Sequence, residues 1–175
     1  MAEKWKNKMN GKQFLKNNSG GALVEFALAA SLMLTLAFGV IDFTRAIYDL
    51  QVMMNLTGEG SNLASRGTSL SDTATAVVNG ASPLEFGTEG CVIVSSVYND
   101  GSTVKVSGQA TQCPNPQISK IGTVGSLANL PSGAVPQANQ TVFATEIFYS
   151  YQTITPIGKL LQTTLPSKLY DVAYY

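Results

Sequence analysis

The longest apolar stretch of the chain runs from Ala22 to Ile41 and contains one charged side chain, Glu25. Leucine, alanine, methionine and phenylalanine dominate this stretch, and Asp42 follows it directly. An α-helix of this length rises about 30 Å, which matches the hydrocarbon core of a bilayer. The pattern therefore predicts a membrane-spanning helix near the N-terminus.

Helical periodicity continues beyond this span. Apolar residues recur at spacings of three and four, at Phe43, Ala46, Ile47, Leu50, Met53, Met54 and Leu56. Polar residues are expected on other faces, at Arg45, Asp49, Gln51 and Asn55. We expect one helix from about Ala22 to about Ser65, about 66 Å long at 1.5 Å per residue, weakened or bent at Gly58 and Gly60. Its second half should pack on the chain's own C-terminal region, and its first half should face lipid or partner helices.

The remaining residues predict a small head. Ser71 is the expected N-cap of a short helix over residues 72–79 that ends at Gly80. Alternating or β-branched runs predict strands over residues 91–98, 103–107, 141–152 and 168–175, and Asn99-Asp100-Gly101 predicts a turn between the first two. Residues 114–140 read as a long loop with a short helical turn. The expected fold class is α+β, with a long N-terminal transmembrane and stalk helix packed on a small antiparallel β-sheet head.

Several tyrosines gather in the last two predicted strands, at Tyr149, Tyr151, Tyr170, Tyr174 and Tyr175. We interpret them as half-buried residues of the sheet. The alternative is a contact surface for another subunit or a host ligand.

Charge is distributed unevenly along the chain. The first twenty residues hold five of the 11 basic side chains and only one of the 11 acidic ones. By the positive-inside rule, the N-terminus is cytoplasmic and the C-terminal bulk lies across the membrane.

The apolar segment has other interpretations, of which a plain signal anchor is one. A cleaved secretory signal is disfavoured because its apolar core is shorter, at about 7–15 residues, and Ala29-Ala30-Ser31 lies in mid-run; a core helix fits the flanking charges poorly.

The composition limits the possible chemistry. The chain has no histidine and two cysteines, so most hydrolase and metal sites are disfavoured, and no basic patch for nucleic acid remains after residue 20. We expect no enzyme activity, no cofactor and no metal. Cys91 and Cys113 flank the predicted hairpin on the non-cytoplasmic side, where disulfides persist, so we expect a bridge; two free thiols are the alternative.

Glu25 is unusual for a membrane anchor. An ionised group deep in a bilayer costs a few kcal/mol and less near the edge, which makes such a residue a functional candidate. The alternative is that Glu25 lies at the level of the lipid headgroups.

The residues around Glu25 resemble a known processing site. Gly20-Gly21-Ala22-Leu23-Val24-Glu25-Phe26 is similar to the cleavage site of type IV-like prepilins, in which a basic leader and a glycine precede a glutamate. The resemblance implies cleavage after Gly20, because Glu25 then becomes the fifth residue of the mature chain. The aromatic Phe26 after the glutamate is typical of the tight-adherence branch.

A longer stretch resembles the TadE-like minor pilins. The similarity covers the start Leu23-Val24-Glu25-Phe26-Ala27-Leu28 and the polar helix that begins at Asp42, and a weaker similarity covers residues 141–161. Many relatives carry a proline where this chain has Ala29-Ala30-Ser31, so a straighter span is expected. The span itself includes Ala22, Leu28, Leu32, Leu34, Phe38 and Ile41.

The resemblance implies a division of the chain and a set of partners. Residues 1–20 would be a basic leader, 21–42 the transmembrane helix, 43–66 the stalk helix and 67–175 the extracytoplasmic head. The implied partners are a prepilin peptidase, the major pilin, a sister minor pilin, the inner-membrane pilus platform and the lipid bilayer. The implied location is the bacterial inner membrane, and the pilus after assembly.

Cleavage would also give Glu25 a role. The freed amine of Gly21 is largely protonated at about pH 7, and a carboxylate beside such a cation loses much of its burial cost. By resemblance, Glu25 pairs with this amine, in its own helix or in a neighbouring subunit, and sets the register during assembly. The alternative functions are a major filament subunit and an uncleaved anchored binding domain with residues 114–140 as its ligand loop. A membrane-tethered enzyme is a third alternative, which the small number of acidic residues in the head disfavours.

Overall fold

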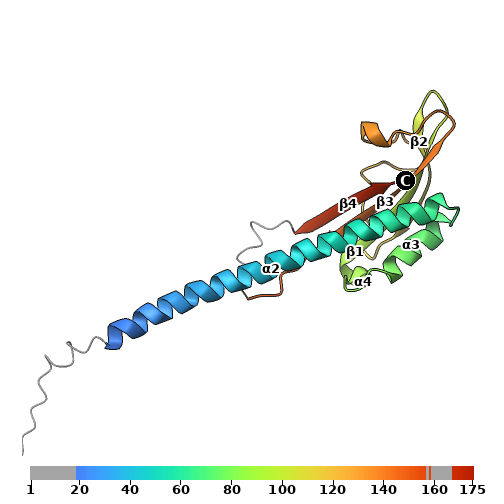
Figure 1. Cartoon of the computed structure of the whole chain (residues 1–175). Coiled ribbons are helices and arrows are strands. Elements are labelled where there is room, and N and C mark those ends of the chain that lie inside the picture. Colours follow the sequence, from blue (N-terminus) through green and yellow to red (C-terminus); the bar gives the residue numbers. More distant parts are fainter. Residues whose placement is uncertain (1–18, 157, 159–166) are drawn as a thin grey trace, which may run out of the picture.

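The computed structural model describes residues 19–156, 158 and 167–175 (Figure 1). The predicted leader therefore lies outside the described residues, apart from its last two positions. The elements in chain order are α2 (Ser19–Ser65), α3 (Leu70–Asn79), α4 (Phe86–Glu89), β1 (Gly90–Asn99), β2 (Val104–Gln112), the 3₁₀ turn η1 (Ser132–Ala134), β3 (Thr141–Ser150) and β4 (Lys168–Tyr174). A long helix on a four-stranded antiparallel sheet confirms the predicted α+β class.

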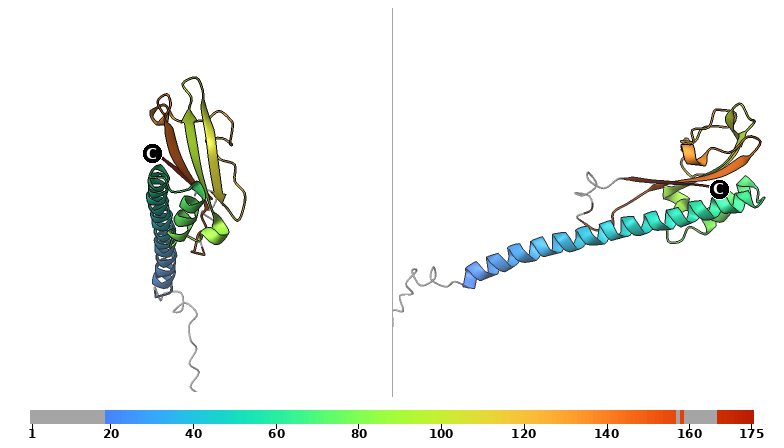
Figure 2. Two further views of the ribbon diagram at one scale, coloured as in Figure 1. Left: turned by 90° about the vertical axis from the view of Figure 1, so that its right-hand side faces the viewer. Right: turned by 45° about the horizontal axis from the view of Figure 1, so that its top comes forward.

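Helix α2 is continuous over 47 residues, about 70 Å at 1.5 Å per residue. No interruption occurs at Ala29-Ala30-Ser31, and the helix also continues through Gly58 and Gly60. Figure 2 shows that the sheet lies beside the C-terminal half of the helix only, whereas the N-terminal half projects away from the head. The helix thus has two environments along its length.

The four strands are antiparallel in the order β2-β1-β3-β4. The turn between β1 and β2 is held by Asp100, whose carboxylate accepts hydrogen bonds from the backbone N–H groups of Ser102 and Thr103 at 2.8 and 2.7 Å. Gly101 adopts the left-handed backbone conformation that this turn requires, with φ of 89°. Strand β2 continues to Gln112, five residues past the predicted end, and its register with β1 shifts at a bulge between Ser96 and Val97.

One face of the sheet is covered by helices. Helix α2 contacts β3 and β4, and α3 contacts β1 and β2. The main apolar core lies between these layers and includes Met53, Leu56, Ala74, Val77, Phe86, Val92, Val94, Ile147, Tyr149 and Tyr151. The second half of α2 therefore packs on the chain's own head, as the periodicity predicted.

The opposite face of the sheet is covered by the long loop between β2 and β3. Ile121 of this loop is buried against Val97, Val106 and Ala144. The sequence predicted this loop and its short helical turn, which is η1, but not its role as the cover of the second face.

Two local predictions were wrong. The N-cap of α3 is Ser69 and not Ser71, because the Ser69 hydroxyl accepts the N–H of Asp72 at 3.1 Å and the helix starts at Leu70. Asp49 does not lie on an outer face of α2 but is 3% exposed against the head. The apolar stripe divides as expected, because Met53 and Leu56 in its second half are buried whereas Phe43 in its first half stays exposed.

Candidate functional site

The N-terminal half of α2 presents an exposed apolar surface. Every residue from Gly20 to Ala29 is exposed. The predicted span residues Ala22, Leu28, Leu32, Leu34 and Ile41 are exposed too, and Phe38 is half-buried. The helix is long and apolar enough to cross a membrane, judged by length and composition, which is consistent with membrane anchoring. Among the described residues, none from the head covers this surface over its first turns.

Gly20, Gly21 and Glu25 lie on consecutive turns at the start of this surface. Nothing lies within 4 Å of the position that a Cβ would take at either glycine. Glu25 and Phe26 are exposed, and no hydrogen bond to Glu25 is formed within the described ranges 19–156, 158 and 167–175. The carboxylate is therefore accessible to a cation supplied by another chain or by a new N-terminus.

The apolar half of α2 meets the head at Asp42, which is 0% exposed. Its carboxylate accepts hydrogen bonds from the backbone N–H groups of Ile154 and Thr155, at 3.1 and 3.3 Å, and a short one from the Thr155 hydroxyl. The Tyr151 hydroxyl donates to the backbone carbonyl of Asp42 at 2.7 Å. These contacts join the loop after β3 to the helix. From the sequence, Asp42 was predicted only as the charge that ends the span, and its burial was missed. The signal that could have indicated burial is that Asp42 is a single acid flanked by apolar residues.

A second acid on α2, Asp49, is buried one to two turns further along. Burial raises the pKa of its carboxyl above the usual value, and the positive charge of Arg45 acts in the opposite direction. Tyr149 and Tyr151 are buried near it, and burial raises the pKa of both phenols. The two tyrosines belong to the interface between helix and sheet, and not to an outer contact surface.

Small residues let α2 approach the last two strands closely. The Thr57 hydroxyl donates to the carboxylate of Asp171 at 2.5 Å. The Ser61 hydroxyl accepts the N–H of Thr145 at 3.0 Å and donates to the carbonyl of Ala173 at 2.8 Å, so it bridges β3 and β4. A Cβ at Gly60 would lie 2.8 Å from the Val77 side chain and 2.9 Å from that of Thr145. Gly60 is therefore a contact residue, although the sequence marked it only as a weak point of the helix.

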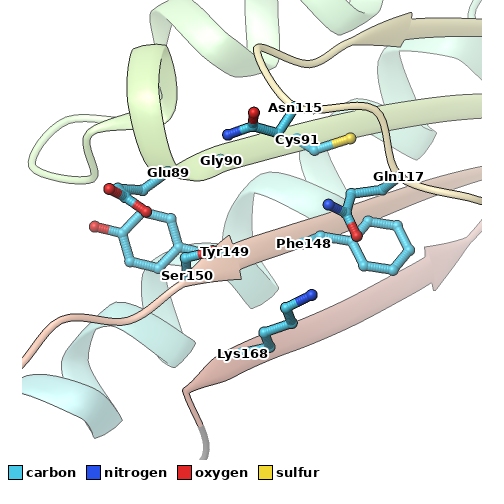
Figure 3. Close-up of a pocket in the computed structure, with 9 residues that line it drawn as sticks. All are labelled: Glu89, Gly90, Cys91, Asn115, Gln117, Phe148, Tyr149, Ser150 and Lys168. Atoms are coloured by element: carbon cyan, nitrogen blue, oxygen red, sulfur yellow. The ribbon is translucent and has the colours of Figure 1, made fainter.

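The two cysteines are joined in a disulfide, as expected, which ties the start of β1 to the loop after β2. Beside it lies a small hollow of about 30 Å³, lined among others by Glu89, Asn115 and Lys168 (Figure 3). A space of this size holds about one water molecule. It is too small for a substrate or a cofactor.

A buried acid lies under the loop on the second face of the sheet. Glu146 of β3 is 0% exposed and accepts a short hydrogen bond from the Ser119 hydroxyl, one from the Lys120 N–H at 2.9 Å and one from the Tyr170 hydroxyl at 3.0 Å. The ammonium of Lys120 lies 3.4 Å from the centroid of the Tyr170 ring. Burial, the charge of Glu146 and the hydrogen bond to it raise the pKa of Tyr170. The cluster fixes the loop to the sheet and was not predicted as a site.

A wider hollow of about 670 Å³ lies between the loop and the end of β4, lined by Pro131, residues 133–137, Gln140, Val142 and residues 172–175. Its walls carry no charged side chain. Ligand pockets have volumes of about 300–1,000 Å³, but they also converge polar groups on the ligand. The described residues contain no group of three His, Cys, Asp or Glu side chains that could hold a metal ion.

Comparison with known proteins places the similarity on α2. The model of the family described as TadE-like protein matches residues 20–61. No curated protein and no solved structure matches the chain significantly. The matched segment contains Gly20, Gly21, Glu25, the exposed apolar surface and Asp42, so the N-terminal region of the chain is similar to the TadE-like family.

Proposed function

We propose that this chain is a membrane-anchored minor pilin of a tight-adherence pilus system. A prepilin peptidase cuts the precursor after Gly20, and the mature chain waits in the inner membrane until it joins or primes a filament. Its partners are the major pilin, a sister minor pilin and the inner-membrane platform, and it catalyses no reaction.

The observation that carries this proposal is the division of α2. The family match covers a helix whose first half is apolar and exposed and whose second half is packed under a folded head. A soluble domain buries such an apolar stretch, because each exposed large side chain costs about 1.5–3 kcal/mol relative to burial. A bilayer or a bundle of similar helices supplies the missing environment.

The geometry at the start of the helix supports processing. Gly20 and Gly21 occupy its first turns, where glycine lowers helix stability by about 1 kcal/mol relative to alanine. Local unwinding there exposes the peptide bond after Gly20 to a peptidase and leaves the rest of the helix intact. The new ammonium of Gly21 then lies one helical turn from Glu25, which can neutralise it or a neighbouring chain's amine.

The direct test is the intact mass and the N-terminal sequence of the protein recovered from native membranes. The proposal expects a chain that begins at Gly21, and a chain that begins at Met1 when the prepilin peptidase is deleted. A chain that keeps its five leader lysines in cells with an active peptidase would refute processing.

One observation favours a second candidate, an uncleaved anchored domain that binds a ligand through its head. The open hollow beside residues 131–137 is large enough for a small molecule, and it lies on the predicted ligand loop. The same N-terminal analysis distinguishes the two functions, because a plain anchor keeps its leader.

A further inference from the structure

The loop that follows β3 returns to α2 at the end of the apolar stretch. In Figure 1 the chain leaves β3 and runs back beside the middle of α2, away from the far end of the head. The backbone N–H groups of Ile154 and Thr155 both bond to the carboxylate of Asp42, and Tyr151 bonds to its carbonyl. The position of Ile154 relative to the helix is therefore fixed by hydrogen bonds.

These bonds hold the loop over the last turn of the predicted span. Side chains on an α-helix lean toward its N-terminus, so the carboxylate of Asp42 lies at the level of the preceding turn. Phe38 and Gly39 on that turn are half-buried, whereas the residues from Ser31 to Ala37 are exposed. A Cβ at Gly158 would lie 2.8 Å from the Asp42 carboxylate, which indicates close packing of the loop on the helix.

Ile154 nevertheless points away from the protein. Its side chain is 57% exposed, although its backbone is bonded to a completely buried aspartate. On α2, the large apolar residues Leu36 and Val40, which precede Asp42, are 60% and 65% exposed as well. The apolar surface of the helix is therefore continued sideways by the loop.

The stretch of helix before the first residues that the head shields has about the length of a bilayer core. Residues 20–37 rise about 27 Å, close to the hydrocarbon thickness of about 30 Å. On the next turn Phe38 and Gly39 are half-buried and Asp42 is buried under the loop, whereas Val40 and Ile41 stay exposed. Helix α2 runs without interruption from the predicted span into the part that packs on the head.

We propose that the first part of this loop, residues 151–156 with Ile154, is a lipid contact of the head, embedded in the interfacial layer of the non-cytoplasmic leaflet. The contact fixes the height and the tilt of the head above the membrane, and Asp42 is its positioning residue. The inference rests on the proposed membrane anchoring of α2, and the test below separates the two.

The experiment uses single-tryptophan variants of the full chain. The chain has one tryptophan, Trp5, which is replaced by phenylalanine in all variants. Tryptophan is then introduced by Ile154→Trp, by Leu32→Trp in the span, and by Val124→Trp. Val124 is a matched control because it is 58% exposed and its neighbour Gly125 bonds to Val106, at the end of the sheet remote from Asp42.

Each variant is reconstituted in phosphatidylcholine–phosphatidylglycerol vesicles with or without brominated acyl chains. We expect bromolipids to quench the fluorescence of Leu32→Trp and Ile154→Trp, with blue-shifted emission for both. The fluorescence of Val124→Trp should escape bromolipid quenching and remain accessible to aqueous iodide. The circular dichroism spectrum checks that each variant is folded. If Ile154→Trp does not fold, a spin label on Ile154→Cys, with collision rates for oxygen and a water-soluble nickel complex, gives the same comparison.

Two outcomes would overturn the lipid contact alone. In both, bromolipids quench the Leu32→Trp variant and do not quench the Ile154→Trp variant. Quenching of the Ile154→Trp variant by iodide would show that the loop lies in water, and protection from both quenchers would show that protein covers it. A chain in which bromolipids quench neither position would refute the membrane anchoring itself.

Discussion

Asp42 joins two parts of the chain that are separated by more than 100 residues in sequence. Two backbone N–H groups and one hydroxyl donate to its carboxylate, so the charge is buried with hydrogen bonds rather than with a cation from the described residues. A buried carboxylate is tolerated when its oxygens accept several hydrogen bonds. Asp42 therefore fixes the position along α2 at which the loop after β3 first contacts the helix.

The first prediction concerns this contact. Asp42→Ala leaves the N–H groups of Ile154 and Thr155 without their acceptor, and hydrogen bonds to charged groups contribute about 1.5–3 kcal/mol each. We expect a lower melting temperature and faster hydrogen exchange in residues 152–156, measured by mass spectrometry. Glu59→Ala, at an exposed position of α2, is the control and should leave that exchange unchanged. Equal exchange in both variants would contradict the role of Asp42.

A second buried acid, Glu146, holds the loop between β2 and β3 on the opposite face of the sheet. Its contribution to stability includes the hydrogen bond that it accepts from Tyr170. The folded state holds the Tyr170 proton more tightly than the unfolded chain does, because its pKa is raised by burial and by Glu146. The contribution of Tyr170 is therefore complete below the ordinary tyrosine pKa of about 10 and is lost as the pH rises above it.

The second prediction follows from this sign. Tyr170→Phe removes one hydrogen bond to Glu146 and should lower the free energy of unfolding by about 1.5–3 kcal/mol near pH 7. Because the native protein loses this contribution in alkali, the difference between variant and native protein should shrink above about pH 10. Urea unfolding at several pH values in detergent measures it. A difference that stays constant into the alkaline range would refute the assignment.

At the scale of elements, the contact between α2 and the sheet depends on a row of small and hydroxyl-bearing residues. Thr57, Gly60, Ser61 and Ala64 recur every three or four positions, so they lie on one face of the helix. They bring the helix close enough for Ser61 to bridge β3 and β4 directly. Larger side chains here would separate the layers.

The third prediction compares two glycines of this helix. Gly58→Ala should raise the free energy of unfolding by up to about 1 kcal/mol, since alanine favours the helix and no atom lies within 4 Å of the new methyl. Gly60→Ala should instead lower it, because the methyl would collide with Val77 and Thr145. Denaturant unfolding of both variants measures the two signs. A stabilising Gly60→Ala would show that the helix does not pack this closely.

The disulfide joins two other elements, the start of β1 and the loop after β2. It closes a segment of 22 residues. In the chain-entropy account, a closed segment of this length stabilises the fold by about 3 kcal/mol. The bridge thus holds one end of the loop that covers the second face of the sheet.

The fourth prediction removes the bridge. The double variant Cys91→Ala, Cys113→Ala should unfold at lower denaturant concentration, by about 3 kcal/mol in free energy. Reduced native protein should behave like the variant, and the variant should not respond to reductant. Identical unfolding of oxidised and reduced native protein would contradict the contribution of the bridge.

At the scale of the whole molecule, a folded head is attached to a long helix whose exposed half is apolar and carries an acid near its free end. The arrangement separates the exposed apolar surface, for which we propose a membrane or filament environment, from the folded head (Figure 2). Glu25 lies near the N-terminal end of α2, in the half of the helix that projects away from the head (Figure 2). Its partner must therefore come from the start of a chain or from another subunit.

The fifth prediction tests this partner. Glu25→Ala should leave the protein in the membrane fraction, because it removes an acid from an apolar helix, but it should abolish incorporation into pili. Glu59→Ala, on the stalk, should assemble normally. Membrane fractionation and pilus preparations from cells measure both steps. Normal piliation with Glu25→Ala would refute the register role.

The apolar pattern alone determined the long helix, its exposed first half and the α+β class. These features follow from local periodicity. An uninterrupted apolar run of this length is longer than a core helix requires, so it predicts an exposed apolar helix whatever the rest of the fold is. The position of Glu25 after two glycines likewise belongs to the sequence. The disulfide followed from two cysteines that flank one hairpin.

The tertiary structure decided which polar residues became buried. Asp42, Asp49 and Glu146 are acids like the exposed ones, and their burial depends on donors and packing partners from distant segments: Thr155 for Asp42, Tyr149 and Tyr151 for Asp49, and Ser119 for Glu146. The same holds for Gly60, whose role depends on Thr145 and Val77, and for the residues of the loop that cover the second face of the sheet. Local sequence specifies the period of a helix or strand, but long-range contacts choose the partners of each side chain.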